Sequence, residues 1–74
     1  MMTKHLLLQE LTRDEAKAIA PEAVAVLPVG ATEQHGPHLP VGTDAFAVEH
    51  IAREAAAIVA QDVPIVVTPT LPFG

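Results

Sequence analysis

A carboxylate and an imidazole lie two residues apart in a segment rich in proline and glycine. Glu33 and His35 flank Gln34, and in extended backbone the side chains at i and i+2 point to the same side. Asp44 follows Glu33 by eleven residues and returns to the same place if the segment between them folds back. Two carboxylates and one imidazole suit Zn²⁺, Mn²⁺ or Fe²⁺ better than Ca²⁺. The spacing therefore makes Glu33, His35 and Asp44 candidate ligands of a divalent metal ion.

Each of these residues also has an ordinary structural role open to it. Asp44, or Thr43 beside it, can cap the helix expected to begin there, and on the pattern alone capping is the commoner use. Glu33 by itself would usually be a solvated charge, and His35 and His38 can form hydrogen bonds within a proline-stiffened loop. The pattern leaves both interpretations open.

Two apolar runs are predicted to form strands on either side of this segment. Residues 23–27 and 65–68 are continuous runs of small and β-branched residues, which is the pattern of strands buried on both faces. With a helix between them they form a βαβ unit, whose strands are parallel. The polar segment then follows the carboxyl end of the first strand, where open α/β sheets place their sites.

Two helices are predicted from capping and periodicity. Thr12 and Glu15 have the spacing of a capping box, and Pro21 should move Ala20 out of helical geometry and end that helix. Residues 44–60 have the period of a longer helix. The face of this longer helix expected to pack on the sheet comprises Val48, Ile51, Ala52, Ala55, Ile58 and Val59. This face is rich in alanine, which permits close approach to the sheet.

The composition excludes several classes of protein. The 74 residues include no cysteine, so disulfides and thiolate zinc sites are absent. A net charge of −5 at pH 7 argues against a nucleic-acid partner. No apolar run is long enough for a membrane span or a signal-peptide core. We expect a cytoplasmic protein that binds neither nucleic acid nor membrane.

The predicted elements do not complete a domain. Two strands and one crossover helix leave sheet edges, and one face of each strand, uncovered. The sequence contains no repeat and no internal domain boundary. We therefore interpret residues 1–74 as the N-terminal segment of a single larger α/β domain.

Three stretches of sequence carry a resemblance to a known family. They are LPVGATEQHGPHLP at 27–40, GTD at 42–44 and TPTLPFG at 68–74. Together they resemble the N-terminal part of the creatininase (creatinine amidohydrolase) family, and the resemblance covers nearly the whole chain from Leu11 onward. It implies a three-layer α/β/α fold with a mainly parallel sheet, a homo-oligomer that is a hexamer in known members, and a pair of divalent metal ions.

The same resemblance assigns expected roles to single residues. By motif position, Glu33, His35 and Asp44 match metal ligands, and Asp44 matches the carboxylate that bridges the two ions. His38 matches a motif histidine that is not a ligand. Family members take further ligands from a later N-G-H-type motif, which this chain does not contain. The catalytic residues are accordingly unknown from this sequence.

Two functions from different classes follow. The first is a metal-dependent amidohydrolase that hydrolyses a C–N bond in a cyclic amide, a formamide or a peptide, using Zn²⁺, Mn²⁺ or Fe²⁺, with the 74-residue chain inactive by itself. The alternative is a non-catalytic structural or interaction fragment. A downstream reading frame that encodes the N-G-H motif would favour the first, and a stop codon directly after the last residue would favour the second.

We expect the isolated 74-residue chain not to fold as a stable monomer. Its strands would lack neighbours, and the conformational cost of about 1–2 kcal/mol per ordered residue would exceed what burial returns. Thermal circular dichroism combined with sedimentation checks this. A sharp, cooperative transition from a monomer would show the expectation to be wrong.

Overall fold

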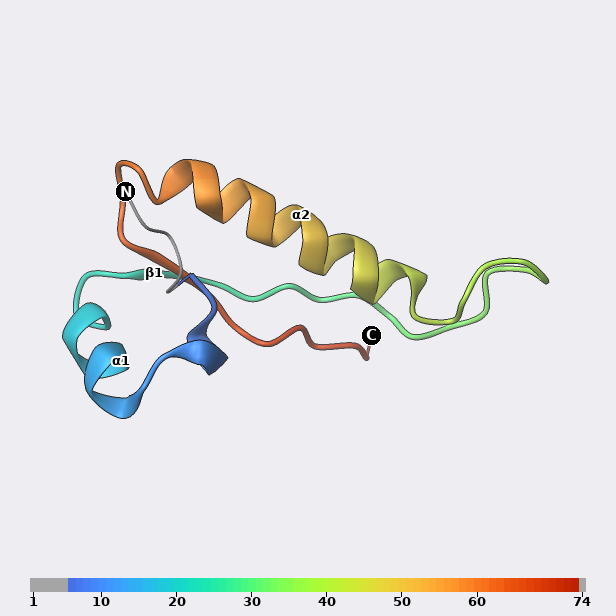
Figure 1. The fold of residues 1–74 in the computed structure, drawn as a ribbon. Coiled ribbons are helices and arrows are strands. Elements are labelled where there is room, and N and C mark those ends of the chain that lie inside the picture. Colours follow the sequence, from blue (N-terminus) through green and yellow to red (C-terminus); the bar gives the residue numbers. More distant parts are fainter. Residues whose placement is uncertain (1–5, 74) are drawn as a thin grey trace.

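A computed structural model describes residues 6–73 and has an α/β architecture (Figure 1). The elements, in chain order, are a 3₁₀ turn η1 (Leu8–Glu10), helix α1 (Arg13–Ile19), strand β1 (Val24–Val26), helix α2 (Thr43–Val59) and strand β2 (Ile65–Val67). β1 and β2 pair in parallel, and α2 connects them. The predicted βαβ unit and the α/β class are confirmed. No helix within this part of the chain is long and apolar enough to cross a membrane.

β2 lies between two other extended segments. On one side its residues pair with β1, with Val26 opposite Val67. On the other side Leu7 forms a parallel bridge to Val67, whose N–H donates to the carbonyl of Leu6 at 2.7 Å. The sequence did not lead us to expect the N-terminal residues in the sheet. Their pairing makes β2 the central strand of the described structure.

The two strands differ in burial. Ile65, Val66 and Val67 are all buried, as predicted for a strand covered on both faces. In β1, by contrast, Val24 is 51% exposed and Ala25 is also exposed. The prediction of two-faced burial is therefore wrong for the first run within this chain, because α2 packs chiefly on β2.

The predicted capping box at the start of α1 is present. Thr12 Oγ1 accepts from the N–H of Glu15 at 3.2 Å, and Glu15 Oε1 accepts from the N–H of Thr12 at 2.9 Å. The helix ends at Ile19, before the proline. Ala20 nevertheless keeps helical angles, φ −54° and ψ −40°, so the prediction for this residue is wrong. The N–H of Ala20 still donates to the carbonyl of Ala16 at 2.9 Å, and this helical hydrogen bond keeps the backbone of Ala20 in the helical conformation.

α2 packs on the sheet through alanine rather than through its larger apolar residues. Ala45 and Ala56 are buried, and Ala52 and Ala60 join the core around Ile65 and Val67. These small side chains allow the helix to approach β2 closely. Ile51 and Ile58, which were predicted to pack on the sheet, are 63% and 69% exposed. Successive residues are rotated by about 100° around the helix axis, so Ile51 does not share the sheet-facing side of α2 with its neighbour Ala52.

The core formed by this chain is small. Among residues 6–73 the buried hydrophobic side chains are those of Ala45, Ala56, Ile65, Val66 and Val67. The radius of gyration is 14.0 Å, whereas a compact domain of this length has a value of about 11 Å. Several large apolar side chains remain exposed, which agrees with the expectation of uncovered faces.

Gly30 marks the point where three segments meet. A Cβ at this position would lie 2.7 Å from both Ala45 N and Asp44 C, so the backbone after β1 contacts the first turn of α2 directly. The N–H of Gly30 donates to the carbonyl of Leu71 at 3.0 Å. Because Gly30 has no side chain, the first turn of α2 can lie directly against the loop after β1, which is also hydrogen-bonded to the segment after β2.

Gly30→Ala should destabilise the protein that contains this chain. The added methyl group would meet backbone atoms that cannot rotate away, and overpacking of this kind typically costs about 1–3 kcal/mol. Gly42→Ala is the comparison variant, because the atoms nearest to a Cβ there belong to the Phe46 ring, at 3.0–3.5 Å, and that side chain is 65% exposed and can move. Only the smaller cost of replacing a glycine at the helix N-cap is expected there. Thermal or urea unfolding of both variants checks this; equal stabilities would contradict the close contact.

Candidate metal site

The loop between β1 and α2 extends beyond the end of the helix and returns (Figure 1). Its two arms are joined by a hydrogen bond from the N–H of Glu33 to the carbonyl of Val41 at 3.0 Å. Gly36 turns the chain with a φ of +81°, and its N–H donates to the side chain of Gln34 at 2.9 Å. The loop thus folds back, as the sequence required for Asp44 to reach Glu33.

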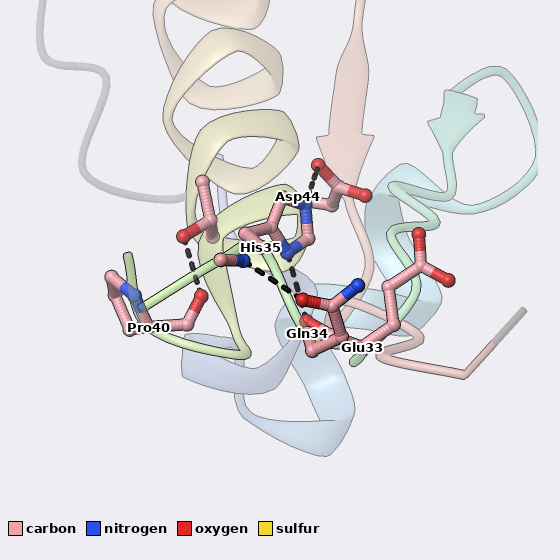
Figure 2. Close-up of polar contacts among 7 residues, drawn as sticks. Glu33, Gln34, His35, Pro40 and Asp44 are labelled. Atoms are coloured by element: carbon pink, nitrogen blue, oxygen red, sulfur yellow. Dashed lines mark hydrogen bonds and ion pairs between the residues drawn. The ribbon is translucent and has the colours of Figure 1, made fainter. Parts of the chain in front are cut away.

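The three predicted metal-site residues lie together. One ligand atom from each of Glu33, His35 and Asp44 lies within 4.8 Å of the others. Figure 2 shows the His35 ring with its two contacts, one to Asp44 and one to the backbone of Glu33. The Glu33 side chain is exposed, while the side chains of His35 and Asp44 are 21% and 45% exposed. The site is open to solvent on the side of Glu33.

The hydrogen bonds of His35 decide which of its nitrogens can bind a cation. Nδ1 lies 2.8 Å from the carbonyl oxygen of Glu33, and because a carbonyl only accepts, Nδ1 carries a hydrogen and donates. In the neutral ring Nε2 then holds a lone pair. This lone pair faces Asp44 Oδ1 at 3.2 Å. Two acceptors at this distance need a proton or a cation between them.

The same contacts raise the pKa of His35 above its ordinary value of 6.5. The hydrogen bond to the Glu33 carbonyl is the largest cause, and the hydrogen bond to the Asp44 carboxylate is the next. Partial burial acts in the opposite direction, and the negative charges of Asp44 and Glu33 add to the increase. Without a bound metal ion, the carboxylates of Asp44 and Glu33 therefore stabilise a proton on Nε2 of His35.

The geometry also suits a divalent metal ion. Two ligand atoms at about 2.1 Å from a tetrahedral ion lie about 3.4 Å apart, and His35 Nε2 and Asp44 Oδ1 are 3.2 Å apart. Metal-binding histidines usually donate their other ring N–H to a backbone carbonyl or a carboxylate, as His35 does to Glu33. The donor set of two carboxylates and one imidazole is typical of Zn²⁺, Mn²⁺ and Fe²⁺.

Asp44 does not cap α2. The N-cap residue is Gly42, and no side chain accepts a hydrogen bond at this cap. The hydroxyl of Thr43 donates to the carbonyl of Pro40 at 2.6 Å, so Thr43 does not cap the helix either. The capping interpretation is wrong for both residues, and Asp44 in the first turn is free to face His35.

Two further observations concern residues around the cluster. His38 is exposed and lies outside this group of ligand atoms. Sequence reasoning missed Thr32, whose hydroxyl donates to the carbonyl of Pro72 at 2.6 Å, and Thr70, which donates to Glu49 at 3.1 Å. The polar residues that follow the second apolar run were the available signal, since parallel strands bring both loops to one edge.

Fold and site together define an α/β protein with a candidate divalent metal site at the carboxyl edge of a parallel sheet. A protein-family model named Creatininase, described as creatinine amidohydrolase, matches residues 9–74. The chain belongs to the creatininase family.

Similar proteins cover most of this chain. The mycofactocin precursor peptide peptidases of two strains of Mycobacterium tuberculosis, CDC 1551 / Oshkosh and ATCC 25618 / H37Rv, are each 42% identical to it over 55 residues, which are 66% of this chain and 22% of theirs. The solved structure of a mutant creatininase matches with a TM-score of 0.83 and 33% identity, over 96% of this chain and 27% of that one. The chain thus spans about a quarter of the length of these relatives.

In the metal-free protein, His35 should titrate above 6.5, and Asp44→Ala should lower its pKa. The stability that His35 contributes is then fully present below its unfolded pKa and is lost as the pH rises through the raised folded value. NMR titration of the imidazole signals checks this. Asp62→Ala, which removes an exposed carboxylate beyond the far end of α2, is the control and should leave the His35 titration unchanged.

Proposed function

We propose that this chain forms the N-terminal part of a metal-dependent amidohydrolase. In this proposal Glu33, His35 and Asp44 would hold a divalent metal ion, and by family resemblance the Asp44 carboxylate would also serve a second ion. The observation that carries it is the pair of acceptors His35 Nε2 and Asp44 Oδ1 at 3.2 Å, with the other ring nitrogen already committed to Glu33.

The residues of this chain would prepare the site for the ion. A bound divalent metal lowers the pKa of water and polarises a carbonyl group, which is the chemistry that amide hydrolysis needs. The carbonyl of Glu33 keeps the proton of His35 on Nδ1 and leaves Nε2 available. The carboxylates of Glu33 and Asp44 supply negative charge opposite the cation. The fold-back of the loop brings these groups within 4.8 Å of one another, within reach of a single ion.

The proposed substrate is a peptide or a small-molecule amide. Support comes from the names of the similar proteins, a peptide peptidase and a creatininase, together with family membership. Three protein ligands are too few for a pair of ions, so the remaining ligands and the catalytic residues would come from other parts of the protein. Zn²⁺, Mn²⁺ or Fe²⁺ as the ion, a homohexameric assembly and a cytoplasmic location are part of the same proposal.

The convergence of ligand atoms favours an enzyme over the alternative, a non-catalytic structural or interaction fragment. An interaction fragment needs no His and carboxylate groups within 4.8 Å of one another. Such a fragment would also gain nothing from fixing the tautomer of His35. The reading frame downstream of this chain separates the two functions directly.

Asp44→Asn in the full-length protein should abolish amide hydrolysis and lower the bound metal. A neutral amide cannot balance two dications or offer two anionic oxygens to them. The fold should survive, because Asp44 makes no cap. Metal stoichiometry and turnover, measured at matched folded fraction, check this, with Asp62→Asn as a control that removes the same charge at the other end of α2.

A chelator provides the complementary test on the wild-type protein. Removal of the ion should abolish turnover, and adding back Zn²⁺ or Mn²⁺ should restore it. Near-normal metal content and turnover in Asp44→Asn would exclude the bridging role. Turnover that resists complete removal of metal would exclude the metal mechanism as a whole.

A further inference from the structure

One hydrogen bond joins the loop after β1 to the segment after β2. The hydroxyl of Thr32 donates to the carbonyl oxygen of Pro72 at 2.6 Å, across forty residues of sequence. Thr32 directly precedes Glu33 in the chain. The contact therefore acts on the backbone next to one of the three proposed metal ligands.

The position of the Glu33 carboxylate depends on its backbone. Within residues 6–73, no hydrogen bond or ion pair holds this carboxylate, and the side chain is exposed. The backbone of Glu33, in contrast, is held on both sides. Its N–H donates to Val41 at 3.0 Å, and its carbonyl accepts from His35 Nδ1 at 2.8 Å. The Thr32 contact fixes the chain one residue earlier.

The segment that carries Pro72 is itself anchored, so it offers Thr32 a fixed partner. The N–H of Gly30 donates to Leu71 at 3.0 Å, and the N–H of Leu71 donates to Pro28 at 2.9 Å. These two bonds extend the parallel pairing past the ends of β1 and β2. A carbonyl adjacent to this ladder cannot move far from the loop that contains Glu33.

Threonine suits this role for a physical reason. A β-branched side chain has few χ1 rotamers, so a hydroxyl bonded to a fixed carbonyl also restricts the backbone that carries it. Small errors in ligand position reduce metal affinity, and partners one layer outside the ligands are typically worth about 10–100-fold in affinity or activity.

We propose that Thr32 is a positioning residue, whose hydrogen bond to Pro72 sets the place of Glu33 relative to His35 and Asp44. This inference rests on the proposed function, since it assigns Thr32 an effect on the metal site. Thr32 touches neither the ion nor the substrate in this proposal. It acts through the backbone of Glu33.

The test compares Thr32→Val with Thr32→Ser in the full-length protein. Valine keeps the shape of the side chain and removes the hydroxyl, whereas serine keeps the hydroxyl. Zn²⁺ affinity, measured by competition with a chromogenic chelator, should fall about 10-fold or more in Thr32→Val and fall clearly less in Thr32→Ser, which keeps the hydroxyl but loses the restriction on χ1. Turnover should follow metal affinity and recover in Thr32→Val when Zn²⁺ is raised to saturation.

Thr70→Val is the matched control. It removes a hydroxyl from the segment after β2, the segment that carries the acceptor of Thr32, but this hydroxyl contacts Glu49 on α2, which is outside the group of ligand atoms. Its Zn²⁺ affinity should equal that of wild type. A loss as large as that of Thr32→Val would mean that any loosening of the segment weakens the site, and would overturn a specific role for Thr32.

The outcomes separate this inference from the proposed function. If the wild-type protein binds no Zn²⁺, the proposed metal site fails. If wild type binds Zn²⁺ and Thr32→Val binds it equally well, the positioning role alone fails. Thr32→Ala replaces Thr32→Val if the valine methyl group, placed against the Pro72 carbonyl, prevents folding, because alanine leaves room there for a water molecule. The same loss of affinity is then expected, with rescue by serine.

Discussion

The parallel pairing of β1 with β2 determines where every residue of the candidate site lies. Parallel strands direct both of their following loops to the same edge of the sheet, so residues 27–42 and 68–73 meet although α2 separates them in sequence. The pairing continues past the strands through Val29 and Leu71. α2 then enters above this edge, with its first turn against Gly30. The candidate metal site is formed where these three segments meet.

Some local features of the fold and of the site could be predicted from the sequence, because they depend on the spacing of residues alone. Glu33 and His35 lie at i and i+2, and the capping box needs only Thr12 and Glu15, so short-range geometry determines both. Asp44 was harder. Its role depends on the fold-back of the loop, which uses hydrogen bonds from Glu33 to Val41 and from Thr43 to Pro40. Helix-capping preferences take no account of these hydrogen bonds. They therefore favoured a capping role for Asp44 that the structure does not support.

The parts of the fold that escaped prediction depend on which surfaces meet. Periodicity places Ile51 and Ile58 on an apolar stripe of α2, but the sheet is approached through the neighbouring alanines, whose small size permits close contact. Likewise, Leu6 and Leu7 form a short apolar run without a strand pattern of their own, and they pair with β2 because its second edge is available. The alanine content of α2 did predict a close approach to the sheet, but the exposure of Ile51 and Ile58 and the pairing of the N-terminal segment could not be predicted from the local sequence.

The central place of β2 also has a consequence for how the chain assembles. β2 is the last of the described strands to leave the ribosome, yet it lies between the two extended segments that precede it, the one at Leu7 and β1. Neither of those segments has a strand partner within the described residues until β2 arrives. Within the described residues, the pairing of these segments therefore has to wait for β2, which inserts between the other two. Such long-range parallel pairing is intrinsically slow. Until it is complete, the unpaired edges of β1 and of the segment at Leu7 can pair with other chains.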